Sequence, residues 1–336
     1  MIIRKPYIYL VFSVLLTLSG LDLHAQQKPV FSQYMVDKFL VNPAFAGSNG
    51  YTTVNLTARQ QYNAFSNPPR TVMVSGQTRL LDDSWIMRTR PVRKKTTRAS
   101  RIQNIGLGAY IFNDRNGIIN RTGFQLTYAY HVKINDSYQI SFGLSGQGYQ
   151  FKLDDSDANL LHSDDPLLLS NKKSFFVPDF NVGTYFSGKG FYAGLSATEL
   201  LGSWIKLGKN KFQQFKTLRH FYFVSGYKIG VTNSFIIEPS LLAQSTVESF
   251  QMDIGMRFFY TRNYWIGFAY RTNNTIVSML GIRMDGFFLG YAYDSNIGAI
   301  KNYSGGSHEL ILGMQLGDNS TRRARWLRPD VSGMEE

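Results

Sequence analysis

Cysteine is absent from this chain of 336 residues. Its absence excludes a disulfide scaffold and thiolate metal sites, and it suits a protein that crosses an oxidising periplasm without mispairing. Long apolar runs are nearly absent too. Beyond the N-terminal region, no stretch reaches the ~20 apolar residues that a spanning helix needs. A membrane location would therefore require strands instead of helices.

The sequence also offers little for catalysis. No nucleophile-elbow or zinc-helix spacing surrounds any of the five histidines, His24, His131, His162, His220 and His308. We predict no enzymatic activity, no catalytic residues, no cofactor and no dedicated metal site. The carboxylate-rich segment 154–165 lacks the glycine and the distal glutamate of an EF-hand loop, which leaves only a looser surface calcium site open there.

The N-terminal region has the layout of a secretory signal peptide. Arg4 and Lys5 precede an apolar run over residues 8–21, and Ala25 is a suitable cleavage point. The run is shorter than a membrane span, which favours cleavage over anchoring. We therefore predict a signal peptide over residues 1–25.

Aromatic residues, in contrast, are abundant. They make up 15% of the chain, with 20 Tyr and 25 Phe, while the mean hydropathy is only -0.19. That balance is too polar for a helical membrane protein, but it fits a strand-built membrane protein with aromatic girdles. The net charge of +13 suits anionic lipid or acidic partners. For a chain with a secretion signal we expect no nucleic-acid partner.

Apolar and polar residues alternate through strand after strand. Tyr138, Phe142 and Leu144 alternate with small polar residues such as Gln139 and Ser145, so the two kinds point to opposite faces of a sheet. One face would meet lipid and the other a polar lumen. The predicted strands cover residues 51–60, 71–80, 105–112, 121–134, 137–151, 177–186, 191–199, 219–229, 235–243, 250–260, 264–271, 276–283, 287–294 and 307–316. The pattern predicts an all-β fold, a transmembrane up-and-down antiparallel barrel of about 14 strands over residues 51–317.

The lengths of the connections support a barrel independently. The connections at residues 135–136, 188–190, 232–233, 262–263 and 285–286 are tight turns, and all of them fall at the same parity. The long connections 152–176, 200–218 and 295–306 all fall at the opposite parity. If the N-terminus starts in the periplasm, the short turns are periplasmic and the long loops extracellular.

Two outer loops are candidates for recognition of a partner. Loops 152–176 and 200–218 are the longest at outward parity, and the second combines lysines with Trp204, Phe212 and Phe215. Aromatic anchors among charges suit protein binding, although ordinary surface loops remain the alternative.

Charged residues at inward parity cluster on late strands. They are Glu238, Asp253, Arg257, Arg271, Arg283, Asp294 and Glu309. Unpaired charges in a narrow lumen would be costly, so we expect crossed ion pairs that stabilise the barrel. A second possible role is to grip segment 26–50, whose short apolar run, broken at Asn42 and Pro43, suits a compact helix and turn at or in the periplasmic mouth.

One connection breaks the parity rule. Segment 81–104 should be short, yet it holds seven basic residues, among them Arg93, Lys94, Lys95 and Arg98. The tail 318–336 adds Arg322, Arg323, Arg325 and Arg328 on the same side. The two basic segments are either solvated charge runs without a partner, or they form a periplasmic face for a partner protein, anionic lipid or peptidoglycan.

Several motifs resemble the PorP/SprF family of outer-membrane proteins of the type IX secretion system. The opening signature spans residues 29–35 and 41–47, with Phe31, Ser32, Gln33, Tyr34, Asn42, Pro43 and Gly47. The likeness continues through residues 178–183, 191–196, 220–222, 238–242, 264–267, 290–294 and 307–310. It covers nearly the whole chain after the predicted signal peptide.

The resemblance implies a non-enzymatic protein of the bacterial outer membrane that assists the export or surface anchoring of large adhesins in secretion and gliding. Its expected partners are the C-terminal signal domain of a secreted adhesin, the type IX translocon with its periplasmic lipoproteins, and outer-membrane lipid. The basic connection 81–104 and the tail 318–336 depart from the family pattern. They leave open whether the chain is a core component or a paralogue dedicated to one adhesin. The alternative reading is a diffusion porin.

Reversal of the basic segment tests the periplasmic docking face. Docking through exposed charges should weaken as salt rises, because such charge pairs are screened over ~10 Å at 0.1 M salt. Changing Arg93, Lys94, Lys95 and Arg98 to Glu should therefore release a periplasmic partner without unfolding the barrel. Co-purification at low and high salt measures the effect. Undiminished co-purification at low salt, or labelling of Lys94 from outside the cell, would contradict the docking face.

Overall fold

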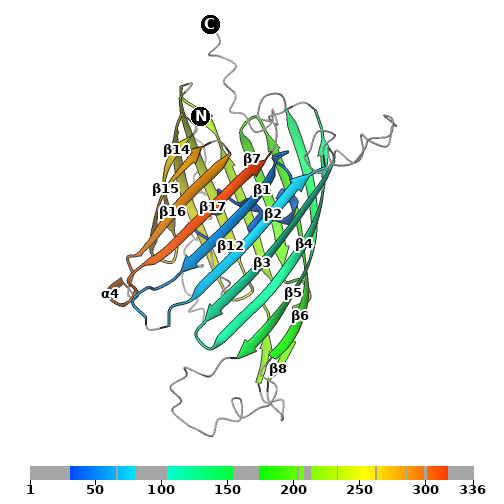
Figure 1. Cartoon of the computed structure of the whole chain (residues 1–336), viewed down its shortest axis with the longest axis vertical. Coiled ribbons are helices and arrows are strands. Elements are labelled where there is room, and N and C mark those ends of the chain that lie inside the picture. The colour runs from blue at the N-terminus through cyan, green and yellow to red at the C-terminus, as the bar shows by residue number, and fades with distance from the viewer. Residues whose placement is uncertain are drawn as a thin grey trace, which may run out of the picture.

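The chain forms a closed β-barrel (Figure 1). A computed structural model describes residues 31–65, 67–80, 104–135, 137–153, 174–202, 204–207, 213–232, 234–261, 263–284, 286–298 and 301–316. No helix within these ranges is long and apolar enough to cross a membrane.

The barrel strands follow one another around the wall in chain order. They are β1 (Thr52–Gln60), β2 (Arg70–Arg79), β3 (Ile105–Asn116), β4 (Ile119–Lys133), β5 (Tyr138–Leu153), β6 (Ser174–Gly188), β7 (Phe191–Thr198), β10 (His220–Tyr227), β11 (Ile229–Gly230), β12 (Phe235–Ser245), β13 (Phe250–Tyr260), β14 (Tyr264–Arg271), β15 (Thr275–Met284), β16 (Phe287–Asn296) and β17 (Ser307–Leu316). Outside the wall lie the hairpin β8 (Trp204–Leu207) and β9 (Gln213–Lys216) and the short helix α4 (Lys301–Ser304). The short 3-10 helices η1 (Lys38–Leu40) and η2 (Pro43–Phe45) precede β1.

Closure comes from the pairing of the first and last strands. Antiparallel β1 and β17 pair from Thr52 opposite Leu316 to Gln60 opposite His308. Strands β10 and β11 both pair with β12 and share one position in the wall, so fifteen strands fill fourteen positions. The prediction of an antiparallel barrel of about 14 strands is confirmed.

Alternation sorts the side chains as the sequence predicts. Gln139, Ser141 and Ser145 of β5 are fully buried in the lumen, whereas Phe142 and Leu144 of the same strand are about half exposed on the outside. The outer surface is the face that lipid covers in a membrane barrel.

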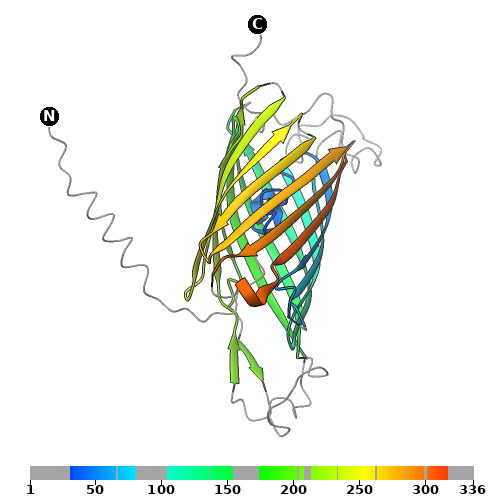
Figure 2. The ribbon, with the colours of Figure 1, turned by 90° about the vertical axis from the view of Figure 1, so that its left-hand side faces the viewer.

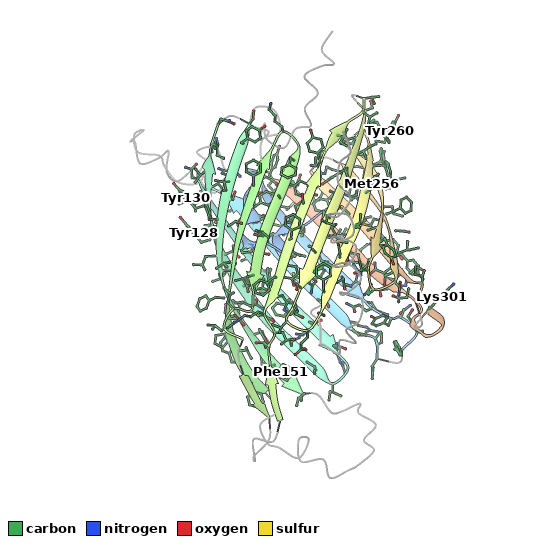
Figure 3. All side chains as sticks on the ribbon, turned by 180° about the vertical axis from the view of Figure 1, so that it is seen from behind. Tyr128, Tyr130, Phe151, Met256, Tyr260 and Lys301 are labelled. Carbon is green, nitrogen blue, oxygen red and sulfur yellow. The ribbon has the colours of Figure 1, made fainter. Side chains whose placement is uncertain are left out.

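Large apolar side chains, three of the four labelled ones aromatic, lie on the outer surface of the barrel. Figure 3 labels Tyr128 and Tyr130 of β4 on one side, and Met256 and Tyr260 of β13 on the other. All four are between 37% and 60% exposed, in positions where lipid would cover them.

The two ends of the barrel differ in their connections. One end, here called the short-turn end, joins β6 to β7, β13 to β14 and β15 to β16 by turns of two or three residues. The other, the long-loop end, carries the connections from β1 to β2, β5 to β6, β7 to β10 and β16 to β17. This matches the predicted parity of lengths. Which end faces the periplasm stays a prediction.

Some strands run farther than predicted at the long-loop end. β5 continues to Leu153 because the inward residues Tyr149, Phe151 and Leu153 form a buried apolar cluster with Val177 of β6. Figure 3 shows Phe151 near this end. The hairpin β8 and β9 lies in a segment predicted to be loop, and its strands of four residues give little periodic signal.

A segment of the chain fills the lumen. Residues 31–50, here called the plug, lie inside the barrel, and η1 and η2 are visible as a blue coil between the strands in Figure 2. Of its side chains, those of Tyr34, Met35, Phe39 and Phe45 are at most 3% exposed. The sequence predicts such a segment at or in the mouth, but the plug reaches much farther along the lumen.

Glycines in the wall let the plug approach the strands. A Cβ atom at Gly143 of β5 would lie 2.2 Å from the backbone nitrogen of Ala44, and one at Gly183 of β6 would lie 2.2 Å from Oδ1 of Asn42. These positions therefore exclude any side chain while the plug is seated. In contrast, Gly146 of β5 points outward, where the nearest atom to a Cβ would be 3.9 Å away in Phe180.

Two substitutions in β5 separate plug seating from barrel formation. We expect Gly143→Val to displace the plug through the clash with Ala44, and thus to raise ion conductance in planar bilayers and to expose residues 31–50 to protease. The control Gly146→Val, on the lipid-facing side of the same strand, should behave like the unmodified protein, which we expect to conduct little. Porin-like conductance of the unmodified protein, or a closed Gly143→Val variant, would contradict a sealing plug.

Candidate functional site: a charge cluster that holds the plug

Five charged side chains meet in the lumen near the long-loop end. Arg59 of β1 contacts Asp294 at 2.6 Å and Glu309 at 2.9 Å, while Arg271 of β14 contacts Asp253 at 2.8 Å and Asp294 at 3.1 Å. All five are at most 5% exposed. We call this set the lumen charge cluster. The crossed ion pairs that the sequence predicts are present.

The plug supplies hydrogen-bond donors to the carboxylates of the cluster. Three carboxylates face only two guanidinium groups, and the backbone N–H groups of Ser32 and Gln33 donate to the two oxygens of Glu309 at 2.7 and 2.9 Å. The Ser32 hydroxyl donates to Asp294 at 2.6 Å and accepts from Arg59 at 2.8 Å. A buried carboxylate without donors costs several kcal/mol, so the cluster and the start of the plug stabilise each other.

A second ion pair holds the middle of the plug. Arg257 of β13 contacts Glu238 of β12 at 2.7 Å and also donates to the carbonyl of Met35 at 3.2 Å. Lys38 of the plug donates to the same carbonyl, and its ammonium lies 4.3 Å from the ring centroid of Tyr192, a cation-π distance. Tyr192 in turn donates to Glu238 at 3.0 Å.

Polar side chains of the early strands hold the opposite flank of the plug. Asp37 accepts from Asn55 of β1 at 2.6 Å and from Ser75 of β2 at 2.8 Å. Its carboxylate is buried, and these two neutral donors replace part of its lost hydration. The wall therefore binds the plug from both sides.

The end of the plug is fixed at the short-turn end. His131 of β4 contacts the carbonyl of Ala46 at 2.9 Å, and Gln77 of β2 accepts from the backbone N–H of Gly47 at 3.1 Å. Gly47 adopts φ 69°, and a Cβ there would meet the carbonyl oxygen of Thr78 at 2.5 Å. Only glycine fits this close approach with a left-handed backbone.

The residues of the opening motif turn out to be plug contacts. Asn42 caps η2 through Ala44 and donates to the carbonyls of Thr184 at 2.9 Å and Leu195 at 3.3 Å. Tyr34 is hydrogen-bonded to Ser240 at 3.2 Å. The remaining motif residues, Phe31, Ser32, Gln33, Pro43 and Gly47, are buried in the same segment.

Six of the seven predicted lumen charges join one of these two ion-pair groups. The seventh, Arg283, is exposed and lies 5.8 Å from the ring centroid of Phe288, outside both groups. Sequence reasoning missed Arg59, the central cation, because it lies on the first strand and reaches Glu309 only through barrel closure. Its inward parity in β1 was the available signal.

Other predicted residues have little or no structural description. Trp204 and Phe215 lie on the paired strands β8 and β9, of which the backbone alone is described. The partner-binding candidate Phe212 and the basic candidates Arg93, Lys94, Lys95, Arg98, Arg322, Arg323 and Arg325 lie outside the described residues, as does segment 154–165. Within the described ranges, no group of three or more His, Asp or Glu side chains is arranged to hold a metal ion.

Comparison with known families identifies the chain. The family model for the "Type IX secretion system membrane protein PorP/SprF" matches residues 23–314, which include the plug and all of the barrel strands except the end of β17. The chain belongs to the PorP/SprF family. A PorP/SprF barrel is a type IX secretion component of the bacterial outer membrane, where it works with the secretion machinery.

Solved structures similar to this PorP/SprF protein are also membrane barrels. The CymD monoaromatic hydrocarbon channel shares 10% identity at a TM-score of 0.43, with 87% of this chain and 94% of that chain covered. The toluene transporter TodX of Pseudomonas putida shares 7% identity at 0.39, with 86% and 93% covered. BamA of Haemophilus ducreyi shares 8% identity at 0.38, with 89% and 83% covered. No curated protein matches the sequence.

Removal of the central arginine tests the mutual dependence of cluster and plug. Arg59→Met should cost about 3–5 kcal/mol, because it leaves the buried Glu309 carboxylate without its cation. We expect release of the plug to protease and a lower unfolding temperature of the barrel in detergent. Adding Glu309→Gln to Arg59→Met should recover part of the loss, because the uncompensated charge is then gone.

The matched control for Arg59→Met is Arg121→Met. Arg121 pairs with Asp114 at 2.6 Å, but its side chain is 20% exposed and its described hydrogen bonds go to Asp114 and not to the plug. Its removal should cost at most about 1 kcal/mol. Equal effects of the two variants, or no rescue by Glu309→Gln, would contradict a special role of the lumen charge cluster.

Proposed function

We propose that this PorP/SprF barrel assists the export or surface anchoring of large adhesins as a non-catalytic component of the type IX secretion and gliding machinery. The observation that supports this role most directly is the seated plug. Because residues 31–50 occupy the lumen and are bonded to the wall at both ends, the barrel suits a docking partner better than a conduit. A diffusion porin would need an open lumen with a lining suited to a solute.

The two ends of the barrel would then meet different partners. In the proposed orientation, the long-loop end faces outward and receives the C-terminal signal domain of the adhesin. Recognition residues would lie in loops 152–176 and 200–218, with Trp204, Phe212 and Phe215 as anchors. Outer-membrane lipid surrounds the wall between the two ends.

The short-turn end would face the machine. Segment 81–104, with Arg93, Lys94, Lys95 and Arg98, and the tail 318–336 would offer basic charge to the translocon or its periplasmic lipoproteins. Both segments follow strands that end at the short-turn side, β2 and β17. No cofactor is needed for this role.

Affinity purification of the tagged, intact barrel from envelope membranes tests the proposed function. Recovery of a large adhesin together with the translocon would support a barrel dedicated to that adhesin, and recovery of periplasmic lipoproteins alone would support a core component. Variants that lack residues 156–172 or 205–215 should lose the adhesin but keep the periplasmic partners. Failure of the intact barrel to recover either class, with normal adhesin display in cells that lack the barrel, would overturn the proposal.

A further inference from the structure

A hollow of about 650 Å³, here called the wall hollow, lies on the outer face of the barrel over strands β1 to β6. Its floor consists of three small outward residues, Gly76 of β2, Ala109 of β3 and Gly146 of β5. Strand pairing puts them in one row, because Gly76 pairs with Ala109, and Leu126 of β4 pairs with both Ala109 and Gly146. The floor is open, since a Cβ atom at Gly76 would meet no atom within 4 Å.

Larger apolar side chains on the outer face surround this floor. They are Val54, Leu107, Leu126, Tyr128, Leu144 and Phe180, and all are exposed. Figure 3 labels Tyr128 among them. The two outward threonines of the lining, Thr52 and Thr78, hydrogen-bond to each other at 2.7 Å. Because these hydroxyl groups already have a partner, the wall hollow suits an apolar occupant.

The wall hollow lies beside the two strand ends that segment 81–104 connects. Strand β2 passes through the floor at Gly76 and ends at Arg79, and β3 begins at Ile105 and reaches the floor at Ala109. Both strands stand side by side in Figure 1. The hairpins at this end are otherwise closed by two to four residues. The one long connection of the short-turn end therefore leaves the wall and returns to it next to the wall hollow.

The sequence of this connection contains a suitable occupant. Three consecutive apolar residues, Trp85, Ile86 and Met87, here called the apolar triad, come before its basic residues. Residues 81–103 lie outside the described residues, so the site consists of the wall alone and the triad is assigned from its sequence and its points of attachment. Three large apolar side chains in a row are unfavourable in water, so the triad needs an apolar surface to cover it.

Reach and size both allow the triad to enter the wall hollow. Gly76 lies four positions before Leu80, about 13 Å along the strand. Trp85 lies five positions after Leu80, and five residues can span up to about 17 Å. The chain can thus fold back over the wall to the level of Gly76. Because a cavity of about 150 Å³ holds one benzene ring, a hollow of about 650 Å³ has room for an indole and two aliphatic side chains.

We propose that the apolar triad docks into the wall hollow and holds segment 81–104 against the outer wall at the short-turn end. The triad competes well with lipid for this place, because attachment at both ends keeps it at a high effective concentration. The basic residues that follow it would then lie at the membrane surface, where long cationic side chains are favourable. This docking does not depend on the proposed function, and it gives the basic residues of that proposal a fixed position on the barrel.

Disulfide trapping tests the docking directly. The chain has no cysteine, so an introduced pair supplies the only thiols. In lipid nanodiscs, Ile86→Cys or Met87→Cys combined with Ala109→Cys should form a bridge within one chain on mild oxidation, because a disulfide requires Cα atoms within about 7 Å. The control combines the same two variants with Ile266→Cys, an exposed outward position of β14 that does not line the wall hollow. We expect no bridge in the control.

Filling the wall hollow provides the second measurement. Gly76→Phe places a ring in the open floor and should displace the triad. Trypsin cleavage after Arg88, the residue next to the triad, should then become about tenfold faster, because burial of one large apolar side chain is worth at least that factor. The control Val72→Phe places the same ring on an exposed outward position of β2 that does not line the wall hollow, and it should leave the cleavage rate unchanged.

Several outcomes would overturn the docking. No bridge to Ala109→Cys, or an equal yield with Ile266→Cys, would leave the wall hollow to lipid. Bridges that join two chains would assign it to a neighbouring copy. Equal cleavage rates of Gly76→Phe and Val72→Phe would also contradict a docked triad. All of these measurements use the purified barrel alone, so their failure leaves the proposed function untouched, and failure to recover an adhesin leaves the docking untouched.

Discussion

The whole interior depends on the compensation of buried charge. Around Arg59 and Arg271 the lumen gathers three carboxylates, and the backbone N–H groups of Ser32 and Gln33, together with the Ser32 hydroxyl, supply donors that the two arginines cannot. Water would do the same in an open pore. In a filled lumen the plug must supply these hydrogen-bond donors. The charges of the wall therefore favour a seated plug over an empty barrel.

The rest of the lumen is shaped around the same segment. Glycines at positions 143 and 183 bring the strands against η2, and Asn42 bridges to the carbonyls of β6 and β7. His131 and Gln77 hold the last residues of the plug at the short-turn end. The barrel and its plug thus form one packed interior, in which polar wall residues find partners that a water-filled channel would not require.

A sealed lumen changes how a secretion-system barrel can work. In the proposed function its surfaces, and not its axis, are the places where partners act: lipid around the wall, the machine at one end and the exported protein at the other.

The sequence by itself determined the wall of this protein. Side chains that alternate with a period of two must face opposite sides of a sheet, so the strands, their approximate bounds, the two kinds of connection and the inward position of residues such as Asp294 follow from local pattern. The short apolar run in residues 31–47, broken at Asn42 and Pro43, likewise predicted a compact segment at or in the mouth of the barrel. None of this required knowledge of distant contacts.

Only the tertiary structure decided which inward residues meet. Arg59 and Glu309 lie 250 positions apart in the chain and become neighbours because β1 pairs with β17. The same closure brings Ser32 to Asp294 and leaves Arg283 outside the ion-pair groups. Parity assigns each residue to the inner or the outer face, but it does not give the residue's position along the barrel axis or around the wall. Ion pairing depends on distances of about 3 Å, and these are set by the register of all fourteen wall positions together.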